Sequence, residues 1–283
     1  MRSVILGTAE GDARIRAVVL DGSRANPGVG RDIFQDYDVT YIVSTLEPFV
    51  TERGWLRAFG DWIIGQTPGE MEILEPGGGD GSFAFLMLFR DGNRVDLTIH
   101  AADRLDQLDL NEWSQVLLDK DGRLDGLPRG ASPYRHTPPT AKRYADCCNE
   151  FWWVSPYVAK SLWRREIPHA LAVQNRALRD MLDLMLTWHI GVTHGLGVQV
   201  GQHGKRLERY LPPELWRRYA DTYAGADAGR CWQALFRMGD LFRDAAAVVG
   251  NARGFPYPAE DDRRVTDYLR HVRSLAADAT GVY

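Results

Sequence analysis

Short apolar runs of strand length recur through the first half of the chain. β-branched and aromatic residues are frequent in these runs, which favours a pleated, half-buried surface. Asp91-Gly92-Asn93 separates two of them and is typical of a hairpin turn. The pattern predicts β-strands at residues 17–20, 37–43, 83–89, 95–99 and 114–118.

Helical spacing of apolar residues governs the second half instead. In the first half we expect helix at residues 12–16, which fit the end of a short helix, and at residues 55–63. Long runs with helical spacing begin after residue 139. The predicted helices of this half are residues 144–166, 168–190, 204–211 with a second run through 223, 231–249 and 261–277.

The chain has 283 residues, which is long for one domain and suits two. Residues 128–139 carry four prolines and few apolar side chains, so they form the best linker in the sequence. We therefore predict an α+β fold, with a domain of mixed strands and helices at residues 1–135 and a helical domain at residues 136–283.

Composition and charge exclude several classes of protein. Hydrophobic residues make up 45% and charged residues 25% of the chain, which is ordinary for a globular protein and argues against a disordered or fibrous one. A net charge of −4 argues against a general nucleic-acid binder, because phosphates call for a basic face. No apolar run approaches the roughly 18 residues of a membrane-spanning helix, so no membrane partner is expected.

The cysteines do not form a disulfide framework. There are three, Cys147, Cys148 and Cys231, with no Cys-x-x-Cys motif, and the adjacent pair cannot make an ordinary bridge. This usage indicates a reducing compartment, and we expect a cytoplasmic protein.

The residues that carry chemistry are spread over three predicted strands. Gly22-Ser23 ends the first strand, Asp36 and Asp38 begin the second, and Asp96 lies in a later one. Side chains alternate along a strand, so Asp36 and Asp38 point the same way. Two such carboxylates repel each other unless a cation lies between them, and Mg²⁺ prefers one or two carboxylates together with water and phosphate oxygens.

Gly22-Ser23 and Asp96 complete this pattern. A glycine lets the backbone approach a polyphosphate closely, and the neighbouring hydroxyl group can donate to it. Asp96 lies between Val95 and Leu97, where a carboxylate is costly unless it is paired or bound to metal. Gly-Ser is also a common turn and Asp-x-Asp also occurs by chance, so the combination and its order favour a function.

This order of residues resembles the nucleotidyltransferase superfamily with a polymerase-β-like core, whose signature is Gly-Ser, then Asp-x-Asp, then a third acidic residue. Residues 21–27 and 32–38 are more closely similar to the aminoglycoside 6-adenylyltransferases, also called streptomycin adenylyltransferases. Further similarity covers both predicted domains, at residues 117–122, 149–160, 204–205 and 210–211. The resemblance implies an antibiotic-resistance enzyme that transfers AMP from ATP to the 6-hydroxyl of streptomycin and releases pyrophosphate.

The resemblance also implies roles for the acidic residues and the lysines. Asp36 and Asp38 would hold Mg²⁺, and Asp96 would act as the base that activates the drug hydroxyl and is a further candidate metal ligand. Gly22 and Ser23 would cradle the terminal phosphates of ATP. Lys205 would bind the triphosphate, with Lys160 as second candidate; alternatively Lys205 is a solvated lysine at a helix start, and Lys160 extends its charged end from an aromatic-rich helix to water.

The helical domain is expected to bind the drug. Streptomycin carries guanidinium groups, which carboxylates and flat aromatic faces bind well. Tryptophans at helical spacing are more often part of a core, so the aromatic candidates have a structural alternative. The candidate drug contacts are Glu150, Trp152, Trp153, Asp180 and Asp183.

Two other functions stay open. The same chemistry could serve another small molecule or a protein hydroxyl as acceptor, or the chain could be a catalytically silent nucleotide-binding module. The presence of all three carboxylates argues against the silent module. We expect a monomer whose partners are ATP and a small-molecule aminoglycoside.

Overall fold

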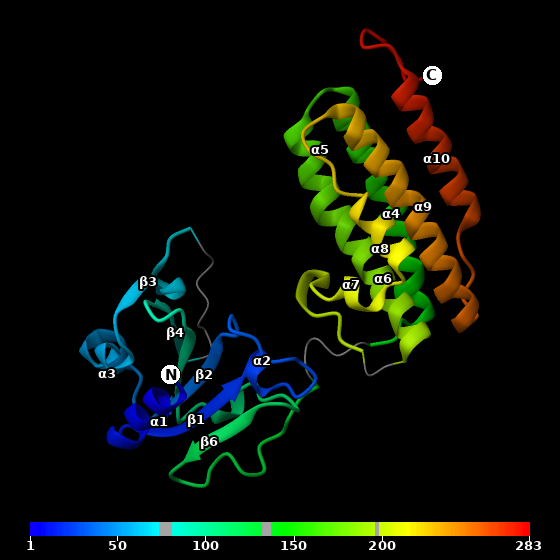
Figure 1. Ribbon diagram of the computed structural model, residues 1–283. Helices are drawn as coiled ribbons and strands as arrows, with labels where there is room; N and C mark the ends of the chain where they lie inside the picture. The colour runs from blue at the N-terminus through cyan, green and yellow to red at the C-terminus, as the bar shows by residue number, and fades with distance from the viewer. Residues whose placement is uncertain (74–80, 132–136, 196–197) are drawn as a thin grey trace. The chain divides into compact units, whose positions relative to one another are not determined.

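The computed structural model describes residues 1–73, 81–131, 137–195 and 198–283. The chain forms two compact units, Met1–Ser132 and Pro133–Tyr283 (Figure 1). The described part of the first unit mixes strands and helices, and that of the second is helical. The boundary predicted between residues 135 and 136 falls in 132–136, which lie outside the described residues.

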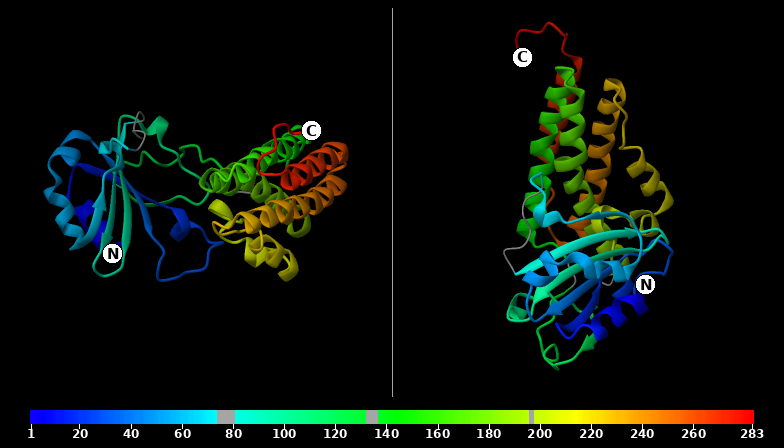
Figure 2. Two further views of the ribbon diagram at one scale, coloured as in Figure 1. Left: turned by 90° about the horizontal axis from the view of Figure 1, so that it is seen from above. Right: turned by 90° about the vertical axis from the view of Figure 1, so that its left-hand side faces the viewer.

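One mixed sheet organises the first unit. The strand order is β3-β4-β5-β2-β1-β6, with β2 parallel to β5 and the other neighbours antiparallel. Figure 2 shows these strands as one twisted layer. The strands are β1 Ile15–Asp21, β2 Tyr37–Val43, β3 Trp62–Gln66, β4 Ser82–Phe89, β5 Arg94–Ala101 and β6 Gln115–Asp119.

Both faces of the sheet carry apolar side chains. The larger cluster joins Val39 and Leu97 to helices that cover one face, and a smaller cluster around Val19 and Ile42 lies on the other. Short helices complete the unit. The covering elements are α1 Arg2–Gly11, α3 Glu47–Thr51 and the 3₁₀ helix η1 Arg53–Phe59; the other short helices are α2 Gly22–Ala25, η2 Pro68–Glu70 and η3 Leu105–Gln107.

The strand predictions hold, including β2 at residues 37–43, whereas two helix predictions in this unit were wrong. The first helix ends at Gly11, and residue 15 already pairs with β2. The expected helix at residues 55–63 is a 3₁₀ helix that ends before Gly60, whose φ of +111° breaks it. Trp62 then begins β3, because pairing with β4 satisfies its backbone.

The second unit is a helical bundle in which α4 contacts α5, α6, α9 and α10 (Figures 1 and 2). The predicted helices are all present, but the run at residues 168–190 is broken into α5, a π-helical turn η4 and α6. The bounds are α4 Ala141–Trp163, α5 Ile167–Val173, η4 Gln174–Leu178, α6 Arg179–His194, η5 Gln202–Gly204, α7 Leu207–Tyr210, α8 Pro213–Ala220, α9 Ala228–Arg253 and α10 Ala259–Ser274.

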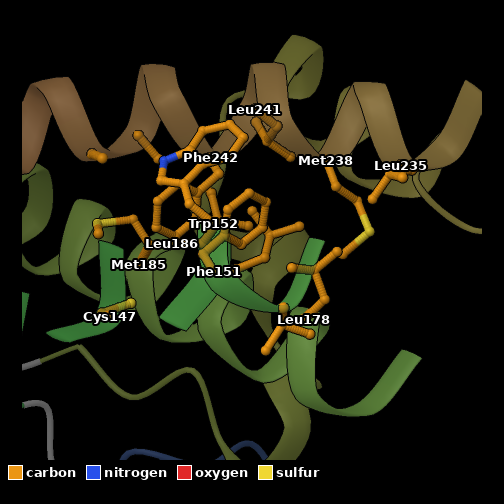
Figure 3. Packing of buried hydrophobic residues seen from close by; sticks show 14 of the residues in the cluster. Cys147, Phe151, Trp152, Leu178, Met185, Leu186, Leu235, Met238, Leu241 and Phe242 are labelled. Carbon is orange, nitrogen blue, oxygen red and sulfur yellow. The ribbon is translucent and has the colours of Figure 1, made fainter. Parts of the chain in front are cut away.

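Aromatic rings from α4 and α9 form the centre of this bundle (Figure 3). Phe151 stacks on Phe242 with ring centroids 3.9 Å apart. The three cysteines are buried and free, as expected, and burial raises the pKa of Cys148 to about 12. Within the described ranges, no helix has both the length and the apolar character of a membrane span.

Candidate active site

Strand register brings three aspartates into one row. β1 pairs with β2 so that Asp21 lies opposite Asp38, and β2 pairs with β5 so that Asp38 lies opposite Asp96. Their neighbours Val39 and Leu97 belong to the larger core cluster, so the aspartates project from the other face. Asp21 and Asp96, which are far apart in the chain, thus lie on either side of Asp38 in the sheet.

Gly22 turns the chain against this row. It follows β1 with a φ of +66°, and a Cβ atom placed on it would overlap Oδ2 of Asp38 and lie 2.6 Å from its Cγ. A side chain at position 22 is therefore excluded on two grounds, the left-handed backbone and the nearby carboxylate. The glycine predicted to let a phosphate approach also lets Asp38 pack against the backbone.

We expect Gly22→Ala to lower kcat/KM by about a hundredfold, because the new methyl group must displace the carboxylate of Asp38. Gly92→Ala is the matched control. Gly92 also has a positive φ, +83°, but no atom lies within 4 Å of the position that a Cβ atom would take there. Both variants should lose about 1–2 kcal/mol of stability from backbone strain. Equal losses of activity in the two variants would mean that the contact with Asp38 is unimportant.

A polar frame joins the turn after Gly22 to the start of β2. The Arg24 guanidinium donates to the carbonyl oxygens of Gln35 and Asp36 and lies 3.8 Å from the centroid of the Tyr37 ring. Gln35 donates through Nε2 to the carbonyl oxygens of Ser23 and Gly30. These bonds fix Ser23, which lies in α2, relative to Asp36, which directly precedes β2.

The acidic row carries more negative charge than its surroundings compensate. Burial raises the pKa of Asp38 to about 6, and the charges of Asp96, Asp36 and Asp21 act in the same direction. Burial also raises the pKa of Asp21, opposed by a hydrogen bond that Asp21 accepts from Ser114. A bound cation would relieve this repulsion.

Arg94 supplies positive charge to the row. Its Nε and Nη2 donate to the two carboxylate oxygens of Asp96, at 2.8 Å each, and Nε lies 3.7 Å from Oδ2 of Asp36. Arg94 and Asp21 were not identified from the sequence. The signal for Arg94 was its position two residues before Asp96, which puts both side chains on one face of β5.

The donor set suits Mg²⁺, which takes oxygen ligands and commonly one or two carboxylates. Asp36, Asp38 and Asp96 provide carboxylates, and the charges of Asp36 and Asp96 raise the pKa of Asp38. Among the described residues, no three His, Cys, Asp or Glu side chains are arranged to hold a metal ion as they stand. The Arg94 guanidinium engages both oxygens of Asp96.

The two candidate lysines lie in the second unit, and both are exposed. Lys205 follows η5, where a Cβ on Gly201 would come within 2.9 Å of its Cγ, so this glycine leaves room for the lysine stem. Lys160 places its ammonium group 4.9 Å from the ring centroid of Tyr157. That contact and the exposure of Lys160 agree with the alternative in which it extends its charged end from an aromatic-rich helix to water.

The candidates on α4 differ in burial. Glu150 is exposed, Trp153 is 64% exposed, and Trp152 is 3% exposed, with its Nε1 donating to the Tyr257 hydroxyl. Both tryptophans line a hollow of about 670 Å³ between α4 and the start of α10. Trp152 is thus mainly a core residue, whereas Trp153 offers an accessible face.

The two aspartates of α6 also differ. Asp180 is exposed, whereas Asp183 is largely buried, and burial raises its pKa to about 6. Oδ1 of Asp183 is buried and accepts no hydrogen bond from any described residue. Arg179, one turn earlier, donates to Thr222. Its charge and the Tyr219 hydroxyl lower the pKa of Asp183 against the effect of burial. Asp183 is therefore the better prepared of the two to bind a cationic group.

Comparison with known proteins matches this chain along nearly its whole length. The streptomycin adenylyltransferase family profile covers residues 1–272. An aminoglycoside 6-adenylyltransferase of Bacillus subtilis is 36% identical over 96% of both chains, and one of Campylobacter jejuni is 35% identical over 94% of this chain and 92% of its own. A crystal structure of an aminoglycoside 6-adenyltransferase from B. subtilis, 34% identical, covers 97% of this chain and 98% of its own with a TM-score of 0.51. The predicted nucleotidyltransferase fold is therefore confirmed.

Proposed function

Because the chain belongs to the streptomycin adenylyltransferase family, we propose that it transfers AMP from ATP to a hydroxyl group of an aminoglycoside and releases pyrophosphate. Streptomycin is the proposed acceptor and its 6-hydroxyl the proposed position. Such a transfer inactivates the drug and would confer resistance. The observation that carries the proposal is the row of Asp38 and Asp96 on parallel neighbouring strands, with Gly22 packed against Asp38.

The roles of the residues follow from this chemistry. Asp36 and Asp38 would hold Mg²⁺, which when bound neutralises charge on the phosphates. The Gly22 backbone and the Ser23 hydroxyl would bind the terminal phosphates, with Lys205 as a further phosphate ligand. Asp96 would accept the proton of the acceptor hydroxyl. The hydroxyl oxygen would then bond to the α-phosphorus of ATP while the bond from that phosphorus to pyrophosphate breaks.

The acceptor is proposed to bind to residues of the helical unit. Guanidinium and ammonium groups of the drug would pair with Asp183, whose buried Oδ1 has no donor among the described residues. Trp153 and Glu150 offer an exposed ring and an exposed carboxylate on α4 for further contacts.

Product analysis tests this proposal. The purified protein is incubated with Mg-ATP and, separately, with streptomycin, spectinomycin and kanamycin, while pyrophosphate release and product mass are followed. AMP added to streptomycin, and not to the other two drugs, is the expected result. Pyrophosphate release with none of them would overturn the drug assignment and point to another hydroxyl acceptor, and no nucleotide turnover with any acceptor would favour the silent binding module.

We expect Asp183→Asn to raise the KM for streptomycin at least about tenfold with little change in kcat, since one charge-assisted bond is lost. The carboxylate must be ionised to pair with a cation, and its pKa is about 6. Affinity of the parent enzyme for the drug should therefore rise as the pH increases through 6, and this dependence should be weaker in the variant. Initial rates at several drug concentrations and pH values measure both effects.

Asp180→Asn is the matched control, because the same change is made at an exposed position on the same helix. It should leave the KM for streptomycin within about twofold, as exposed charges contribute little. A KM that rises equally in both variants would mean that general charge, not the buried carboxylate, attracts the drug.

A further inference from the structure

We propose that Arg94 acts as a counter-cation to the acidic row. Before metal binds, its guanidinium holds Asp96 and Asp36, and it competes with a divalent cation for these carboxylates. The inference rests on the proposed function, because it takes Asp36 and Asp38 to hold the metal and Asp96, the proposed base, to be a further ligand. It makes Arg94 a positioning residue: it sets the arrangement of the acidic side chains and the affinity of the site for metal.

The contacts of Arg94 converge on the row. Its guanidinium forms a two-bond fork with Asp96, 2.8 Å for each bond, and reaches to 3.7 Å from Asp36. Asp38 lies beside Asp96 in the strand register, so the fork forms next to the carboxylate at the middle of the row. One side chain thus contacts two carboxylates at the row.

The arginine competes with the reaction for the same oxygens. A planar fork uses both oxygens of Asp96 in its preferred direction, and these are the oxygens that would bind metal or accept a proton. A metal ion that takes Asp96 as a ligand therefore competes with the fork for its carboxylate oxygens.

Opening the fork is feasible because the arginine is not enclosed. The Arg94 side chain is 46% exposed, and it lies at the first position of β5, next to the turn of the β4–β5 hairpin. A long side chain at such a position can swing into water readily, since ion pairs with this exposure are weak. The pair is strong enough to order Asp96 and weak enough to be displaced.

Mn²⁺ binding without nucleotide tests the proposal. Free Mn²⁺ is measured by electron paramagnetic resonance during titration of the full chain and of its Arg94→Gln and Arg94→Lys variants. We expect Arg94→Gln to bind Mn²⁺ about tenfold more tightly than the parent, because the competitor has gone. Arg94→Lys keeps the charge but cannot form the fork, so it should bind about threefold more tightly.

Two results would overturn the proposal. One is Arg94→Gln binding Mn²⁺ no more tightly than the parent, since the fork would then not compete. The other is Arg94→Lys equal to the parent with only Arg94→Gln tighter, since the general charge would then account for the effect.

Further variants locate the effect and exclude unfolding. Arg90→Gln removes the same charge from an exposed position of the hairpin and should leave Mn²⁺ binding unchanged. Asp38→Asn combined with Arg94→Gln should abolish the gain if the metal binds in the row. Circular dichroism melting of every variant checks the fold. The titration uses no nucleotide or drug, so failure of the drug assignment would leave its outcome interpretable.

Discussion

Asp38→Asn is expected to reduce kcat at least about a thousandfold, the loss typical when a charge that stabilises the transition state is removed. Asp38 lies in the middle of the row, between Asp21 on β1 and Asp96 on β5. We therefore expect its carboxylate to be the most important ligand of a metal ion bound at the row. Pyrophosphate release with saturating Mg-ATP and drug measures the effect.

The same variant should be more stable than the parent when metal is removed with EDTA. The pKa of Asp38 rises from 3.8 to about 6 on folding, so the folded state disfavours the ionised form. The stability contributed by this group is therefore present at low pH and is lost as the pH rises from 3.8 through 6. An amide has no such penalty, and we expect Asp38→Asn to gain about 1–2 kcal/mol at about pH 8.

Opposite signs for activity and stability distinguish a catalytic carboxylate from a structural one. Asp106→Asn, an exposed position in the same unit, is the control and should change neither quantity appreciably. If Asp38→Asn lost activity and stability together, its carboxylate would be holding the fold, and the metal assignment would lose its support.

Asp96→Asn is expected to lower kcat by about two to four powers of ten while ATP still binds, because an amide cannot accept the proton of the acceptor hydroxyl. This separates the base from the phosphate ligands Gly22 and Ser23, which the substitution leaves in place. Single-turnover rates measure chemistry, and equilibrium titration of ATP measures binding.

A nucleotide-binding module without activity would respond differently to the same substitution. It would show no turnover in the parent chain, and Asp96→Asn would leave nucleotide affinity unchanged. If instead the substitution weakened ATP binding and slowed turnover to the same extent, Asp96 would be acting mainly through the metal. Asp106→Asn again provides the matched change of charge.

Most strands of the sheet, and Asp38 and Asp96 of the row, could be predicted from the sequence because local pattern determines them. β2 runs over the predicted residues 37–43, and apolar neighbours of Asp38 and Asp96 fix which face each carboxylate takes. The helices of the second unit were predicted for the same reason, since their apolar spacing is long and regular.

Other features depend on contacts that sequence pattern does not record. Trp62 and Ile63 continue the helical spacing of Trp55, but pairing with β4 makes them a strand. The contact of Arg94 with Asp36 depends on the pairing of β2 with β5, which places residues 36 and 94 near each other. Asp180 and Asp183 are the same residue type on one helix, so the sequence does not distinguish them. They differ only in burial, which is set when α6 packs in the bundle.

The parallel pairing of β2 with β5 has an evolutionary consequence. Side chains alternate between the two faces of these strands, so an insertion or deletion next to Asp38 or Asp96 would turn the aspartate inward and the core residue outward together. Length changes should therefore accumulate in the connecting loops and be purged from these two strands. A descendant of this chain that has lost activity but still folds should carry a point substitution at the row, with both strands at their present length.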